Sequence, residues 1–209
     1  IAWLDRRAPT LFWIIAATLV LSRVLLAAYS PWAYGYIYDP YWDGVEKLHD
    51  TWRIPASTDC WECYQPPLYL LASLPFYAAG RRLWPASPWP HDSALRLMQI
   101  VPMASSLVCL WYCYRLLRLF RYRGAYLVIG IAVAAALPVL FMSSYSLEPD
   151  LLLGAIVTMF AFHATRWYVQ PDAAPLGRVI RLGVLSGLAA AVAVFGFEVN
   201  STNERVPST

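Results

Sequence analysis

The sequence predicts an all-α protein: a polytopic transmembrane helical bundle with juxtamembrane helices in its first outer loop. Three observations predict this fold. Of the 209 residues, 59% are hydrophobic and only 14% are charged, whereas soluble domains carry about 25% charged residues. The apolar residues form long blocks, several of them near the ~20 residues that cross a bilayer. Arginines cluster between these blocks. The net charge of +3 is too small to indicate nucleic-acid binding, so the lipid bilayer is the expected partner.

Five apolar blocks are predicted to span the membrane. They cover residues 10–28, 94–117, 125–146, 150–168 and, at marginal length, 181–197. The positive-inside rule orients them, because the clusters at Arg6–Arg7, at 115–123 and at 166–181 all become cytoplasmic if residues 29–93 form one outer loop. We therefore expect a multi-pass protein of a bacterial-type plasma membrane, with residues 1–197 as one transmembrane module.

The outer loop is predicted to carry two surface helices, at about 39–52 and 67–84. Asp39 followed by Pro40 is a helix-start signature, with Asp as N-cap and Pro at the first helical position. The second helix starts at consecutive prolines, and its apolar run, 68–79, has twelve residues. That length suits a helix lying along the membrane surface better than one crossing it.

Acidic residues at the outer boundaries are the candidate chemical groups. Asp39 and Asp43 lie four residues apart and can share a helical face. Glu148 and Asp150 lie between two predicted spans, at the next outer corner. A purely structural role, as N-caps and complements to helix dipoles, remains an alternative for both sites. The functional interpretation is an acidic cluster at the membrane surface, where ionisable groups are costly and usually functional.

Cys60 and Cys63 form a lone C-x-x-C pattern in the outer loop. A zinc site would need two further ligands, and only His49 and His91 are available there. In an oxidising outer compartment a local disulfide is the expected state.

The order of these elements resembles the N-terminal module of the GT-C membrane glycosyltransferases. A first span precedes an outer loop with Asp39 and Ile54-Pro55, then Gln65-Pro66-Pro67-Leu68-Tyr69, then Arg96-Leu97 at the start of a span. An arginine-rich turn and Leu147-Glu148-Pro149 follow. Within this superfamily the chain is most similar to the group related to protein O-mannosyltransferases and aminoarabinose transferase, with the RgtA/B/C/D-like domain. The resemblance covers about residues 10–190.

The resemblance implies transfer of a sugar from a polyprenyl-phosphate carrier to a glycan, lipid or protein acceptor on the outer face, as part of cell-envelope chemistry. It implies that Asp39 activates the acceptor, with Asp43 as the fallback, and that Glu148 is the second acidic position. A divalent cation between these three carboxylates is compatible with the pattern but not required.

The resemblance also implies a binding site for the carrier phosphate and the substrate. Gln65 matches a position where relatives carry a basic residue, and a neutral Gln supplies only a hydrogen bond. The phosphate charge would then need Arg81, Arg82 or Arg96. The residues expected to bind substrate are therefore these three arginines and Gln65, Tyr69 and Asp150.

The tail at 198–209 is polar and differs from the continuation that the resemblance implies. We interpret it as the product of a truncation or a frameshift near residue 195, so that this chain would be the N-terminal part of an enzyme and inactive alone. The alternative function is a transporter or lipid-carrier flippase subunit without glycosyl transfer. That alternative predicts carboxylates facing each other inside the spans, rather than at their outer boundaries.

Overall fold

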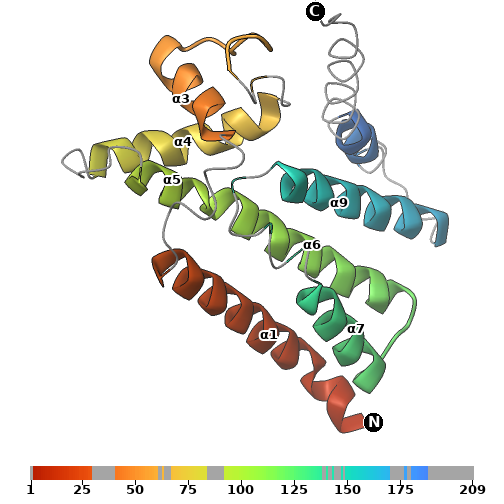
Figure 1. The fold of residues 1–209 in the computed structure, drawn as a ribbon. Coiled ribbons are helices and arrows are strands. Elements are labelled where there is room, and N and C mark those ends of the chain that lie inside the picture. The colour runs from red at the N-terminus through yellow and green to blue at the C-terminus, as the bar shows by residue number, and fades with distance from the viewer. Residues whose placement is uncertain are drawn as a thin grey trace, which may run out of the picture.

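The fold was analysed in a computed structural model of the chain (Figure 1). The structure describes residues 2–29, 41–60, 63, 67–83, 92–137, 140, 143, 147, 149–169, 177 and 180–187. All regular secondary structure in these ranges is helical, which confirms the all-α prediction for this part of the chain.

The helices follow one another along the chain; the connections between α5, α6 and α7 are short, whereas that between α3 and α4 covers residues 52–66. They are α1 (Ala2–Tyr29), α3 (Tyr41–Thr51), α4 (Pro67–Leu83), α5 (Asp92–Met98), α6 (Ile100–Leu119), α7 (Gly124–Ala136) and α9 (Asp150–Val169). Residues 180–187 are also helical. Two stretches are long and apolar enough to cross a membrane: Ser93–Leu119, with 27 residues, and Asp150–Val169, with 20.

Three predicted ranges differ from the observed helices. Helix α1 begins at Ala2, eight residues before the predicted span, and continues through Pro9. The predicted span at 94–117 is α5 followed by α6, which meet at Gln99. The predicted span at 125–146 is interrupted, because α7 ends at Ala136, Leu137 is not helical and Leu140 is helical again. Leu137 adopts an extended conformation (ψ 124°), as expected for a residue that precedes a proline, because the proline ring disfavours the helical region there.

The long helices run in alternating directions. Phe12 of α1 contacts Trp111 and Tyr114 of α6, and Ala8 lies beside Arg118, so α1 and α6 are antiparallel. Helix α7 returns along α6 after a tight turn, and packs on α1 as well (Figure 1). Helix α9 runs parallel to α6, because Gly154 faces Cys109 while Phe162 lies over Arg115.

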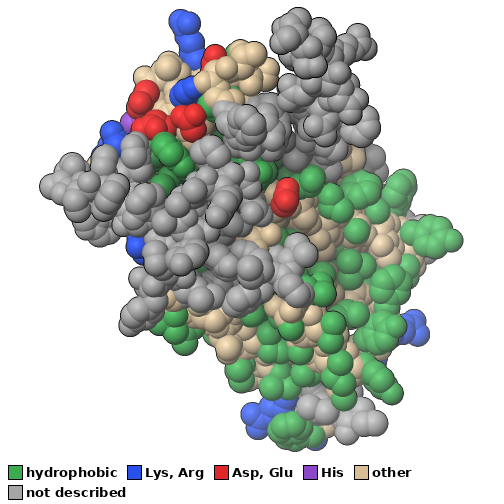
Figure 2. Space-filling model, in the orientation of Figure 1, with side chains coloured by type: hydrophobic (Ala, Val, Ile, Leu, Met, Phe, Trp, Pro, Cys, Tyr) green, Lys and Arg blue, Asp and Glu red, His purple; other side chains and the backbone are tan. Residues whose placement is uncertain are grey.

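This alternation gives the bundle two ends. We call one the turn end; it holds the start of α1, the turn at 120–123 and the last turn of α9. The other is the loop end, which holds α3, α4, α5, Leu147 and the starts of α6 and α9 (Figure 1). Figure 2 shows acidic side chains gathered over α3 at the loop end, and none among the coloured residues at the opposite, lower end of the view.

Two hydrophobic clusters hold the structure together. One lies inside the bundle and joins α1, α6 and α7 through Phe12, Leu110, Tyr114 and Ile131. The other lies at the loop end and joins α3 and α4 to α5 and α6. Burying apolar side chains supplies the main stabilisation, roughly 25 cal/mol for each Å² removed from water.

Candidate functional site

The loop-end cluster unites segments that are far apart in the sequence. Val45 and Leu48 of α3 pack with Tyr69, Leu70 and Tyr77 of α4. The same buried cluster continues into α5 and α6, and it includes Leu147, whose exposed fraction is 1%. The members from those segments are Ala94, Leu95, Met98, Val101 and Leu147. Helices α3 and α4 and Leu147 therefore share one core with α5 and α6.

Below the acidic face of α3, a hydrogen bond joins α3 to α4. The Oη atom of Tyr77 donates to Oε1 of Glu46 at 3.0 Å, and the Tyr77 side chain has an exposed fraction of 0%. Burial, followed by the nearby Glu46 carboxylate, raises the pKa of Tyr77 above its ordinary value. Tyr77 is therefore a neutral donor that holds the Glu46 carboxylate in a fixed place.

His49 and Asp50 form a second polar group next to Tyr77. Nδ1 of His49 lies 2.9 Å from Oδ1 of Asp50, and the imidazole packs edge-on against the Tyr77 ring at 5.4 Å between centroids. Arg81 is close enough to Tyr77 to oppose the rise in its pKa. The α3–α4 interface thus carries Glu46, His49, Asp50 and Arg81 around one buried phenol.

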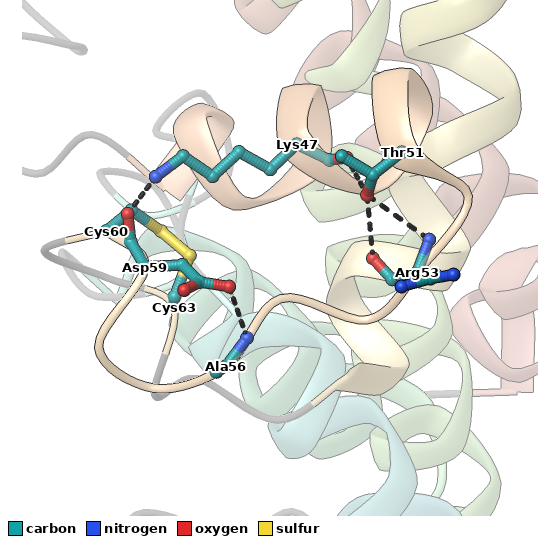
Figure 3. Close-up of a disulfide and its surroundings, with 7 residues drawn as sticks. All are labelled: Lys47, Thr51, Arg53, Ala56, Asp59, Cys60 and Cys63. Carbon is teal, nitrogen blue, oxygen red and sulfur yellow. Dashed lines mark hydrogen bonds between the residues drawn. A yellow bond between two sulfur atoms is a disulfide. The ribbon is translucent and has the colours of Figure 1, made fainter.

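A disulfide between Cys60 and Cys63 closes the segment that follows α3 (Figure 3). Nζ of Lys47 donates to the backbone oxygen of Asp59, and Oδ2 of Asp59 accepts from the Ala56 amide at 2.7 Å. Oγ1 of Thr51 donates to the backbone oxygen of Lys47 at 2.7 Å and accepts from the backbone amide of Arg53 at 3.3 Å (Figure 3). These contacts hold residues 52–60 against the side of α3.

The disulfide also packs against the start of α3. A Cβ atom on Gly44 would be in ordinary contact with Sγ of Cys63 at 3.8 Å and would lie 3.1 Å from Cδ2 of Leu70, so a larger residue would require the Leu70 side chain to shift. Gly44 follows Asp43 directly. Asp43 lies in the first turn of α3 and has a half-buried side chain.

Helices α4 and α5 approach closely at Gly80. A Cβ atom there would lie 2.4 Å from Cα of Ala94, and Oγ of Ser93 donates to the Gly80 backbone oxygen at 3.2 Å. This contact sets the last turn of α4, with Arg81 and Arg82, beside α5, which carries Arg96. The three arginines named as candidates for the carrier phosphate thus come from two adjoining helices.

The remaining predicted residues fall into three groups. Asp39, Gln65 and Glu148 lie outside the described residues. Tyr69 is buried, with an exposed fraction of 1%, and packs edge-on against Tyr41. Asp150 is exposed in the first turn of α9. Tyr69 is thus part of the core of the loop end, where a bound substrate would reach it only by displacing its neighbours.

No metal site is formed by the described side chains, since none of them make a group of three or more His, Cys, Asp or Glu residues suited to a metal ion. Asp39 and Glu148, two of the three carboxylates considered for a divalent cation, are outside this set.

Sequence reasoning did not single out Glu46, Asp50 or Tyr77, and it considered His49 only as a possible zinc ligand. One signal for the carboxylates was present: Asp43, Glu46 and Asp50 are spaced i, i+3 and i+7 and so share a helical face. The partner, Tyr77, lies 31 residues from Glu46, and only the packing of α3 on α4 brings them together.

Comparison with known proteins finds no matching family model, no matching curated protein and no matching solved structure.

Proposed function

We propose that this chain is the N-terminal transmembrane module of a GT-C-like membrane glycosyltransferase. It would transfer a sugar from a polyprenyl-phosphate donor to an acceptor at the outer membrane surface. The observation that carries the proposal is the shared core at the loop end. Val45 and Leu48, which follow Asp43, and Leu147, which precedes Glu148, are members of one buried cluster. The two carboxylate-bearing segments are thereby anchored to the same core.

The proposed topology places the loop end outside the cell and the turn end in the cytoplasm. Two stretches are long and apolar enough to span, and α1, with 28 residues, contains the apolar block at 10–28. Most of the described arginines of the predicted cytoplasmic clusters lie at or near the turn end. Those with a place in the bundle helices and the turn are Arg6, Arg7, Arg115, Arg118, Arg121, Arg123 and Arg166, whereas Arg181 lies in the separate helical segment at 180–187. The positive-inside rule favours this orientation.

Helix α7 sets a condition on this topology. Its 13 residues rise roughly 20 Å, less than the ~30 Å of the hydrocarbon core. A span at 125–146 would therefore need residues beyond Leu137 to complete the crossing. The parallel course of α6 and α9 supports such a return, because it requires the chain between them to come back to the loop end.

The proposed chemistry is an inverting displacement at the anomeric carbon of the donor sugar. A carboxylate, Asp39 or in its place Asp43, accepts the proton of the acceptor hydroxyl as that oxygen attacks. The bond between the anomeric carbon and the phosphate oxygen breaks, and polyprenyl phosphate leaves with the electron pair. Glu148 orients the acceptor. A positioned general base typically contributes 10²–10⁴-fold to the rate.

The departing phosphate needs positive charge near the membrane surface. Arg81, Arg82 and Arg96 would supply it from adjoining helices, with Gln65 as a hydrogen-bond donor. Guanidinium groups suit this task because they bind phosphate oxygens in a bidentate fashion. The disulfide between Cys60 and Cys63 would hold the segment before Gln65 against α3.

Transfer assays test this proposal with the complete gene product in membrane vesicles and a radiolabelled polyprenyl-phosphate sugar. We expect Asp39→Asn or Asp43→Asn, and Glu148→Gln, to lower the transfer rate at least 100-fold. Asp59→Asn is the matched control, because an Asn oxygen can still accept the hydrogen bond from Ala56 while the charge is removed.

Unchanged transfer in all three carboxylate variants would overturn the assigned roles. Movement of the labelled donor across the vesicle membrane, with no sugar transferred to any acceptor, would instead establish the flippase function.

A further inference from the structure

A basic pocket opens at the turn end, far from the carboxylates of the loop end. It lies between the start of α1, the end of α6 and the start of α7, and has a volume of about 280 Å³. Buried Ala8 and Leu127 form its apolar floor, and exposed Arg118, Arg121 and Arg123 line its rim. Its size is close to the lower limit of about 300 Å³ for small-molecule sites.

The three guanidinium groups have no carboxylate partner among the described side chains. Arg118 donates from Nη1 to the hydroxyl of Tyr114 at 3.2 Å, a contact with a neutral group, so no described side chain neutralises its charge. Helix α7 begins at this pocket, with no acidic residue in its first turn and no side-chain cap from Arg123. The positive end of the α7 dipole therefore adds to the field of the arginines.

The turn that carries these arginines has an unusual residue at its centre. The amide of Tyr122 bonds to the oxygen of Leu117, and that of Arg121 to the oxygen of Arg118, both at 3.0 Å. This pair of bonds is a Schellman motif, in which glycine is the commonest residue at the left-handed position. Here Arg121 occupies that position with φ 62°. The turn thus presents a guanidinium group at the pocket from a backbone conformation that favours glycine.

The surroundings of the pocket match the level of lipid headgroups. The stretch Ser93–Leu119, which is long enough to span, ends directly before Phe120. Tyr122 lines the pocket, and further exposed aromatic side chains lie on the same segments of the chain: Trp3, Phe120 and Tyr126. Aromatic residues gather at membrane–water boundaries because their rings are apolar with a polar edge.

From this geometry we infer a binding site for the phosphate group of an anionic lipid, lined by Arg118, Arg121 and Arg123 at the turn end of the bundle. Arginines bind phosphate oxygens in pairs, and basic pockets between membrane helices suit anionic headgroups. The apolar floor would face the glycerol and the first carbons of the acyl chains. The site is independent of glycosyl transfer and needs only that α6 spans the membrane.

Native mass spectrometry of the purified 209-residue chain tests the site by counting phosphatidylglycerol molecules that remain bound. The pocket variant changes Arg118, Arg121 and Arg123 to Gln. The control variant changes Arg6, Arg7 and Arg166 to Gln, which removes the same charge from the same end without touching the pocket. We expect the pocket variant to bind roughly 100-fold more weakly, and the control to bind within about threefold of the wild type.

Two further experiments distinguish a lipid phosphate from a soluble one and test a single variant that should fold normally. Phosphatidylcholine vesicles and soluble inorganic phosphate replace the anionic lipid in parallel thermal-shift titrations. A response to inorganic phosphate that is lost in the pocket variant supports a phosphate site and assigns the soluble ion as an occupant; a response to phosphatidylglycerol alone assigns the lipid. The single variant Arg121→Gly, which suits the turn, should bind about fivefold more weakly.

Equal losses in the pocket and control variants would overturn the site, because binding would then follow diffuse charge. Arg121→Gly binding at wild-type strength, or no pocket-dependent response to either phosphate source, would also overturn it.

Discussion

Gly80 of α4 and Ala94 of α5 meet so closely that a Cβ atom on Gly80 would lie 2.4 Å from Cα of Ala94. The added Cβ atom would meet backbone atoms of α5. A change of side-chain rotamer therefore cannot relieve the clash. We expect Gly80→Ala to lower the free energy of unfolding by about 1–3 kcal/mol, because the two helices must separate. Denaturant unfolding of the solubilised protein measures this change.

Gly183→Ala is the matched control for that variant, since no atom lies within 4 Å of the added Cβ. In a helix, alanine is favoured over glycine by up to about 1 kcal/mol, so this variant should be equal to or more stable than the wild type. A Gly80→Ala protein as stable as the Gly183→Ala protein would contradict the close approach of α4 and α5.

The hydrogen bond from Tyr77 to Glu46 is expected to contribute measurably to the packing of α3 on α4. Tyr77→Phe keeps the ring and removes the hydroxyl, which leaves Glu46 without this donor. A hydrogen bond to a charged group is worth about 1.5–3 kcal/mol. We expect a loss of stability in that range, whereas Tyr168→Phe, at a position with an exposed fraction of 89%, should change stability by less than about 0.5 kcal/mol.

The raised pKa of Tyr77 predicts a loss of stability in alkali. Burial and the Glu46 carboxylate favour the neutral phenol in the folded state. Its contribution is therefore fully present below the unfolded pKa of about 10, and is lost as the pH rises above that value toward the folded pKa. The stability difference between wild type and Tyr77→Phe, measured from pH 8 to pH 11, should shrink above pH 10. A constant difference over that range would contradict a buried, neutral Tyr77.

The disulfide between Cys60 and Cys63 is expected to stabilise the segment that packs on α3. It closes a short loop, for which the chain-entropy estimate is about 2 kcal/mol. Dithiothreitol should lower the free energy of unfolding of the wild type by roughly that amount. The double variant Cys60→Ser, Cys63→Ser should have the lower free energy of unfolding already without reductant, and dithiothreitol should not change it. Equal stability with and without reductant in the wild type would contradict this role.

We expect that replacing Arg121 can make the protein more stable. Its left-handed conformation, φ 62°, is strained for any residue with a Cβ atom. We expect Arg121→Gly to raise the free energy of unfolding by up to about 1 kcal/mol. Arg123→Gly is the control: its backbone is extended, with φ −138°, so glycine there should lower stability through chain entropy. The opposite order of the two variants would contradict the strain at Arg121.

Much of the helical content could be predicted from local pattern. The apolar block at 150–168 corresponds closely to α9, and the prolines before Leu68 correspond to the start of α4. The end of α7 at Ala136 was missed, although Pro138 was visible in the sequence. The span at 125–146 was predicted from its continuous apolar run. A proline restricts only the backbone of the residue before it, and this local effect was outweighed by the apolar pattern.

The candidate site could be predicted only in part, because its polar contacts join distant segments. Asp43 and the C-x-x-C pair carry local signals, a helix start and a fixed spacing. No local pattern in the sequence indicates the pairing of Glu46 with Tyr77, because the two residues are 31 positions apart and each alone is an ordinary helical side chain.

The sequence by itself determined that the chain is helical and roughly where most helices lie, because helical period and hydropathy are local properties. Only the tertiary structure decided that α1 and α6 are antiparallel while α9 runs along α6, and that Leu147 joins the core of α3 and α4. It also decided that Arg118, Arg121 and Arg123 surround one pocket with Ala8. These relationships depend on how apolar faces pack against one another, and packing is fixed by the shapes of side chains from many segments at once.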